Sequence, residues 1–151
     1  MYLKDITDDF IKRSTPGKGH IYIEEGIDRI SHKQEIETAH WLLDNFGGEI
    51  TVLNDYRTYN VKYPDYEWNG KYWELKYTTT KNSLEKAIRK AVAQISKKPG
   101  GIIINTSLSN LGRINGELIK RLSKTKIKHL LIIIKDNKSL IKILEYNKRN
   151  K

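Results

Sequence analysis

Apolar residues recur along the chain in two arrangements, each typical of a different element. Helical spacing marks three segments, residues 36–46, 83–97 and 115–123. Two almost uninterrupted apolar runs, 102–105 and 129–134, are typical of strands covered on both faces. Shorter extended segments are expected at 20–24, 49–53 and 140–146, the last at a sheet edge. Helices that alternate with buried strands predict an α/β sandwich, in which helices flank a central mixed sheet.

The organisation along the chain follows from this pattern. Residues 1–18 are mostly polar and end in the turn signal Thr15-Pro16-Gly17, so we expect a loosely attached segment or linker remnant there. Residues 19–146 form the predicted domain, and 147–151 a basic tail. A chain of 151 residues is long enough to bury one core.

The most informative stretch is a predicted hairpin, with arms at 60–67 and 71–77. Asn69-Gly70 is the preferred two-residue loop of a type I′ turn. That loop places Asp65 opposite Glu74, with Cβ atoms about 5 Å apart. Lys76 then shares the face of Glu74, roughly 7 Å along the strand. The register thus gathers two acids and a lysine.

Such a cluster suits metal-dependent phosphodiester chemistry. Two carboxylates at cross-strand distance repel each other unless a cation lies between them, and Asp65 and Glu74 offer oxygen ligands for Mg²⁺ or Mn²⁺. Such an ion generates a hydroxide nucleophile and neutralises charge on a phosphoryl oxygen. Lys76 would orient or deprotonate the water, or stabilise the transition state. The alternative is a solvated polar hairpin face with a Glu–Lys ion pair.

These residues resemble the PD-(D/E)XK nuclease superfamily, as Pro64-Asp65 followed by Glu74-Leu75-Lys76. The stretches HKQEIETAHWLLDNFGGEI and PDYEWNGKYWELK, followed by a lysine-rich helix, resemble the C-terminal tRNA-nuclease toxin domains of the CdiA type, over residues 18–136. Similar domains occur in phage and mobile-element proteins. The resemblance implies a restriction-endonuclease-like three-layer sandwich, a tRNA or RNA endonuclease and a small acidic immunity protein as partner.

The superfamily resemblance also implies an acid on the first core helix, and helical geometry chooses between two glutamates. Glu35 falls inside the apolar arc of residues 36–46, whereas Glu37 points to solvent. A buried charge needs a partner, so we predict Glu35 as a third acidic group of the site. Alternatively, Glu35 only favours the helix dipole in the first turn, with Ser31 as the N-cap.

The helix at 83–97 adds a further candidate. The resembled family carries a glutamine near this place, so Gln94 is assigned a supporting role; the alternative is an ordinary residue at the edge of the apolar stripe. The outer surface of the helix carries four basic residues suited to a nucleic-acid backbone, Lys86, Arg89, Lys90 and Lys97.

Composition narrows the function. The 28 Lys and Arg against 18 Asp and Glu give a net charge of +10, which favours a polyanionic partner. The alternative is a merely basic soluble protein. The chain has no cysteine, which excludes disulfides and thiolate-bound zinc. It has no apolar run long enough for a signal peptide core or a membrane span, so we expect action in the cytoplasm, with delivery by a larger secreted or phage protein left open.

The sequence therefore predicts a metal-dependent endoribonuclease toxin domain that cleaves tRNA by phosphodiester hydrolysis. Attack by the RNA's own 2′-hydroxyl, without metal, stays open as a route. Two alternatives remain: a DNA endonuclease of the same fold, and a catalytically inactive nucleic-acid-binding module.

Overall fold

The computed structural model describes residues 2–54, 63–78, 81–107, 111–137 and 139–148. Within them, four helices and eight strands follow one another in the order β1(Tyr2–Asp5), α1(Thr7–Arg13), β2(Gly19–Ile23), α2(Lys33–Phe46), β3(Gly48–Val52), β4(Tyr66–Trp68), β5(Lys71–Thr78), α3(Lys81–Ile95), β6(Pro99–Thr106), α4(Leu111–Leu122), β7(His129–Lys135) and β8(Leu140–Asn147). No described helix combines the length and apolar character needed to cross a membrane.

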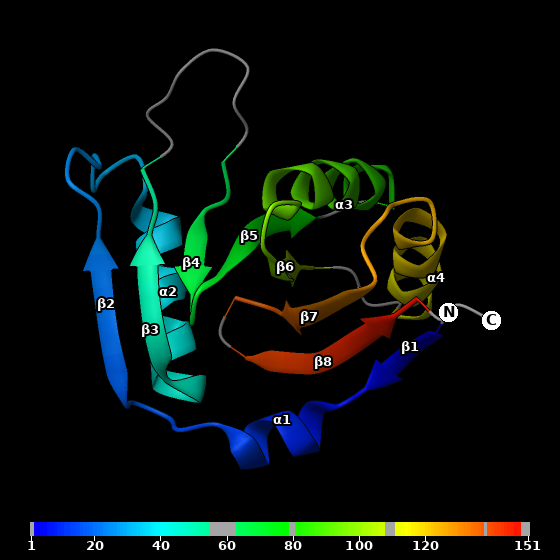
Figure 1. Ribbon diagram of the computed structural model, residues 1–151, viewed down its shortest axis with the longest axis horizontal. Helices are drawn as coiled ribbons and strands as arrows, with labels where there is room; N and C mark the ends of the chain where they lie inside the picture. Colours follow the sequence, from blue (N-terminus) through cyan, green and yellow to red (C-terminus); the bar gives the residue numbers. More distant parts are fainter. Residues whose placement is uncertain (1, 55–62, 79–80, 108–110, 138, 149–151) are drawn as a thin grey trace.

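All eight strands join one mixed sheet, in the order β1-β8-β7-β6-β5-β4-β3-β2. Strands β5, β6 and β7 run parallel at its centre, and β2 runs parallel to β3. The four remaining pairs are antiparallel. The sheet is strongly twisted, from the nearly upright β2 and β3 to the nearly horizontal β7 and β8 in Figure 1. Because β5, β6 and β7 are parallel, their carboxyl ends meet at one edge of the sheet. Polar groups of all three strands gather there.

Helices cover both faces of this sheet and confirm the predicted α/β sandwich. Helices α3 and α4 lie together beside β5–β8, whereas α2 passes behind β3 and β4 (Figure 1). Alternate residues of the central strands divide between two cores: Ile102 and Ile132 pack with α3 and α4, and Ile103 and Ile133 pack with α2. The continuous apolar runs of β6 and β7 are explained by this burial on both faces.

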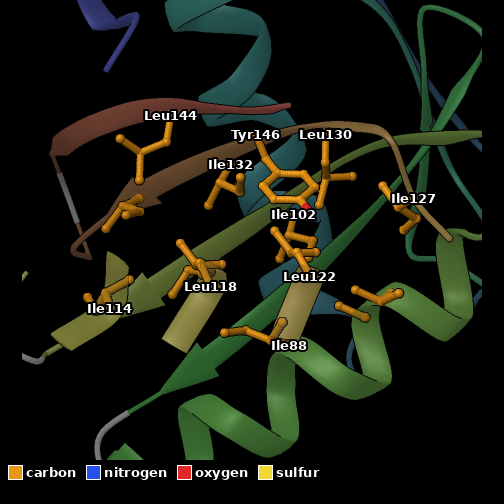
Figure 2. Packing of buried hydrophobic residues seen from close by; sticks show 14 of the residues in the cluster. Ile88, Ile102, Ile114, Leu118, Leu122, Ile127, Leu130, Ile132, Leu144 and Tyr146 are labelled. Carbon is orange, nitrogen blue, oxygen red and sulfur yellow. The ribbon is translucent and has the colours of Figure 1, made fainter. Parts of the chain in front are cut away.

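The core under α3 and α4 is built almost entirely of aliphatic side chains. Figure 2 shows Leu118 and Leu122 of α4 directed at the sheet, Leu118 toward Ile132 and Leu122 toward Ile102. All apolar positions predicted for the face of α3 are buried there, Leu84, Ala87, Ile88, Ala91, Val92 and Ile95. This packing fixes α3 against β5, where the candidate acids lie.

The predicted hairpin register is confirmed. Tyr66 pairs with Trp73, and Trp68 pairs with Lys71. Asn69 and Gly70 have φ values of 50° and 83°, so both occupy the left-handed region that a type I′ turn requires. The first arm is shorter than expected, because β4 begins at Tyr66. Residues 60–62 of that predicted arm lie outside the described residues.

The expectation of a loose N-terminal segment is wrong for residues 2–13. Strand β1 pairs along its whole length with β8, from Tyr2 opposite Asn147 to Asp5 opposite Leu144. Helix α1 then packs Phe10 against Phe46 of α2, with ring centroids 5.2 Å apart. The backbone pairing of β1 also covers β8, so β8 is not the edge strand that the sequence predicted.

The ends of α2 differ in part from the prediction. Gly47 follows its last turn with a φ of 75°, as expected for a glycine that ends a helix. Ser31 is not the N-cap, because His32 occupies that position and makes no side-chain cap bond. The nearby carboxylate of Asp28 accepts the N–H groups of Ile30 and Ser31 instead, and so satisfies the donors of the turn before the helix.

Candidate catalytic site on the central hairpin

Asp65 lies just before β4 and is held by bonds to both neighbouring strands. Its carbonyl accepts the N–H of Leu53 at 2.9 Å. Its Oδ2 accepts the N–H of Leu75 at 2.8 Å. Because the side chain itself replaces a backbone acceptor of the ladder, its position is tied to β5. Asp65 is half-buried there, beside the fully covered Pro64.

Glu74 is the buried member of the cluster, with 3% of its surface exposed. Its Oε1 accepts the N–H of Asp65 at 2.9 Å, and its Oε2 lies 3.0 Å from the Nζ of Lys76. The Lys76 side chain keeps 20% of its exposure. The structure thus brings Asp65, Glu74 and Lys76 together on the face covered by α3, as the register predicted.

The two carboxyl groups perturb each other. Burial, followed by the charge of Glu74, raises the pKa of Asp65 well above its usual value of 3.8. Burial also raises the pKa of Glu74 above 4.5, although the charge of Lys76 opposes this. A proton on one of the two groups would allow a hydrogen bond between them. Without a cation, the pair therefore favours a shared proton over two adjacent negative charges.

This shared proton predicts how stability varies with pH. Both folded pKa values are raised, so the contribution of the pair is complete below the ordinary values and is lost as pH rises through the folded values. Asp65→Asn removes one charge and keeps an acceptor for Leu75. As pH rises from about 4 to about 8 in EDTA, we expect wild type to lose unfolding free energy relative to Asp65→Asn, by at most about 1.4 kcal/mol per pH unit.

Urea denaturation at each pH measures the difference. The exposed Asp44 supplies the control, since Asp44→Asn should follow the wild-type curve at a constant offset. Parallel curves for wild type and Asp65→Asn would show that the pair does not hold an extra proton.

Glu35 lies on α2, whereas the other three candidate residues lie on or beside the hairpin. It is half-buried at the start of α2, and its carbonyl accepts the hydroxyl of Tyr66 at 2.6 Å. Its charge contributes to the raised pKa values of Asp65 and Tyr77. Glu37 is exposed, as predicted. The described residues contain no group of three or more acids, histidines or cysteines placed to hold a metal, and Glu35 remains a prediction as a third acidic group of the site.

Gln94 of α3 contacts the segment of chain that leads into Asp65. Its Nε2 donates to the carbonyl of Tyr63 at 3.2 Å, just before Pro64 and Asp65. Its Oε1 is buried with no hydrogen-bond partner among the described residues. This bond connects α3 to the segment before Asp65, and the supporting role of Gln94 stays a prediction.

The predicted basic residues divide between the helix and the turn after it. Lys86, Arg89 and Lys90 are exposed on α3. Lys97 is exposed too, but it follows the helix, which ends at Ile95 rather than at residue 97. Since α3 covers the face that carries Glu74 and Lys76, these side chains lie on the outer surface above the candidate site.

A second set of polar groups was missed by the sequence reading. Asn105 and Lys135 lie near the carboxyl ends of β6 and β7 on the α2 face, and both are buried, at 7% and 3% exposure. The sequence did contain a signal for these residues, because each apolar run ends in a polar residue. Polar residues at the carboxyl ends of adjacent parallel strands commonly line a ligand site.

The chain is similar to known proteins in its sequence family and in its fold. A family model described as the contact-dependent growth inhibition CdiA C-terminal domain matches residues 62–139, just over half of the chain. A solved structure, the CdiA-CT/CdiI toxin and immunity complex from Burkholderia pseudomallei, contains a chain that is 16% identical, with 83% of this chain and 92% of that chain covered at a TM-score of 0.48. No curated protein sequence matches the chain.

Proposed function

The chain belongs to the family of contact-dependent growth inhibition CdiA C-terminal domains, and from this premise we propose that it is the toxin domain of a larger secreted protein and acts as a nuclease. The observation that carries the proposal is the Asp65–Glu74–Lys76 cluster. A buried and a half-buried carboxyl group with raised pKa values beside a lysine are typical of a functional site rather than a solvated strand face.

We assign the cluster to the PD-(D/E)XK type. Mg²⁺ binds proteins through one or two carboxylates and keeps several waters, so the Asp65–Glu74 pair fits it, or Mn²⁺, without a third acid. A bound ion would supply charge neutralisation at the phosphate and a more acidic water. Asp65 and Glu74 would hold the ion as carboxylates, and the Lys76 ammonium, 3.0 Å from Glu74, would orient the water or stabilise the transition state.

The substrate that we propose is RNA, specifically tRNA. The net charge of +10 favours a polyanion. Lys86, Arg89 and Lys90 are exposed on the helix that covers the site, where they are suited to contacts with a phosphate backbone. A small acidic immunity protein that binds this basic surface and blocks the site would be the cognate partner. The domain would act in the cytoplasm of the target cell, where tRNA is found.

The decisive experiment compares cleavage of total bacterial RNA and of plasmid DNA with Mg²⁺, Mn²⁺ or EDTA. We expect discrete tRNA fragments with either metal and none in EDTA. Glu74→Ala and Lys76→Ala should both abolish them, and Lys71→Ala, an exposed lysine of the same strand, should not. Fragments that persist in EDTA would indicate attack by the 2′-hydroxyl. Cleavage of DNA alone would identify a DNA endonuclease, and no cleavage would favour an inactive binding module.

A further inference from the structure

A small cleft opens on the α2 face of the sheet, at the carboxyl ends of β5, β6 and β7. Its volume is about 210 Å³. Two aromatic side chains line it, the half-buried Trp41 and the exposed Tyr77. Three polar side chains at its base, Thr38, Asn105 and Lys135, are only 5%, 7% and 3% exposed. Buried polar groups beneath aromatic rings are the composition of a ligand site rather than of a core.

The polar groups of the cleft can hydrogen-bond a ligand. The Lys135 Nζ lies 4.7 Å from the centre of the Trp41 ring and donates to the Asp136 carbonyl at 2.8 Å. An ammonium has three donors, so this bond leaves capacity for a ligand. Glu37 lies at the rim, where its carboxylate is paired with the Nζ of Lys33 at 3.7 Å. The cleft thus offers the donors of Lys135 and the amide group of Asn105 to a ligand.

The cleft adjoins the candidate catalytic site through β5. Tyr77 directly follows Lys76, and consecutive strand residues point to opposite faces about 3.3 Å apart along the strand. The charge of Glu35 contributes to the raised pKa values of both Asp65 and Tyr77, so both sites lie within its electrostatic reach. A nucleic-acid strand that crosses the end of β5 would therefore meet both.

We propose that this cleft binds one unpaired nucleobase of the RNA substrate, next to the phosphate that is cleaved. The base stacks on Tyr77 and Trp41, while Asn105 and Lys135 hydrogen-bond its edge. The cleft has a volume of about 210 Å³, and sites for drug-sized ligands begin at roughly 300 Å³. A cleft of this size therefore suits a small ligand such as a single base. Proteins read single-stranded RNA in this way, through stacking and contacts to base edges. The inference rests on the proposed function and adds sequence preference to it.

The test measures binding separately from cleavage. The full chain carrying Glu74→Gln, which we expect to be inactive, is titrated with labelled single-stranded homopolymers of A, C, G and U, and anisotropy gives the affinities. We expect one homopolymer to bind best. Tyr77→Ala should weaken its binding roughly 5- to 150-fold. Asn105→Asp replaces a donor by an acceptor and should change which homopolymer is preferred. Tyr22→Ala, an exposed tyrosine of β2, should leave all four affinities unchanged.

The outcomes separate this inference from the proposed function. If wild type cleaves RNA but Tyr77→Ala and Asn105→Asp keep the parent's affinities and preference, the cleft is not a base site. If both variants change the homopolymer preference but wild type cleaves no RNA, the cleft is a base site and the nuclease proposal fails. Absence of RNA binding overturns both. Competition by inorganic phosphate and not by free nucleosides would make the cleft an anion site. If Asn105→Asp does not fold, as judged by thermal unfolding, Tyr77→Ala decides.

Discussion

Glu74→Gln should lower the rate of RNA cleavage by about 10²- to 10⁴-fold while the protein stays folded. The amide keeps the shape of the side chain and an oxygen acceptor for the N–H of Asp65. It removes the negative charge that pairs with Lys76 and that a metal ion would need. Single-turnover cleavage of bacterial tRNA at saturating Mg²⁺ measures the loss directly.

Glu67→Gln is the matched control, because it makes the same chemical change on the same hairpin. Glu67 lies one strand away, and its carboxylate pairs with Lys98 at 3.3 Å on the surface. Its replacement should leave the rate within about twofold, since a surface pair contributes little. A Glu74→Gln enzyme as active as Glu67→Gln would falsify the role given to the buried carboxylate.

Trp68→Ala should cause the largest loss of stability, about 3–5 kcal/mol. The Trp68 Nε1 donates to the Gly47 carbonyl at 3.0 Å, and its ring centroid lies 4.8 Å from that of Trp73. The side chain thus ties the hairpin to the end of α2, and truncation leaves both a cavity and an unsatisfied carbonyl. For a chain of this size the melting temperature should fall by roughly 6–20 °C.

Two further variants locate the cause of that loss. Trp68→Phe retains most of the ring contact but not the hydrogen bond, so it should lie between wild type and Trp68→Ala. Tyr22→Ala removes an aromatic side chain that is 52% exposed, and should change the unfolding free energy by about 0.5 kcal/mol or less. Urea denaturation followed by circular dichroism compares all three. Equal stability of Trp68→Ala and Tyr22→Ala would contradict the assigned packing.

The candidate cluster was predictable because its geometry is local. Asn69-Gly70 selects one turn type, the turn fixes the register, and the register places Asp65 beside Glu74. The apolar runs of β6 and β7 were equally clear, since burial on both faces leaves no polar positions to obscure them. Short-range chemistry and strong periodicity therefore account for the part of the fold that carries the acids.

Long-range contacts account for what the sequence did not reveal. Strand β1 is short and polar, and its partner β8 lies at the other end of the chain, so no local pattern marks the pairing. The depth at which Glu74 is buried depends on cover from α3, which the hairpin does not encode. The cleft at Tyr77, Asn105 and Lys135 draws each residue from a different strand, and only the finished sheet brings them together.

The first strand of the fold pairs with the last, which brings the two described ends of the chain next to each other. Tyr2 and Asn147 are direct cross-strand partners, so the described ends of the chain lie about 5 Å apart at one corner of the sheet. Figure 1 shows β1 beside β8 at that corner. A short linker could therefore join them, with new ends opened at another exposed turn. The same arrangement of strands and helices could thus be reached with a different order of elements along the polypeptide. Such circular permutants would allow probes to be attached away from the candidate site.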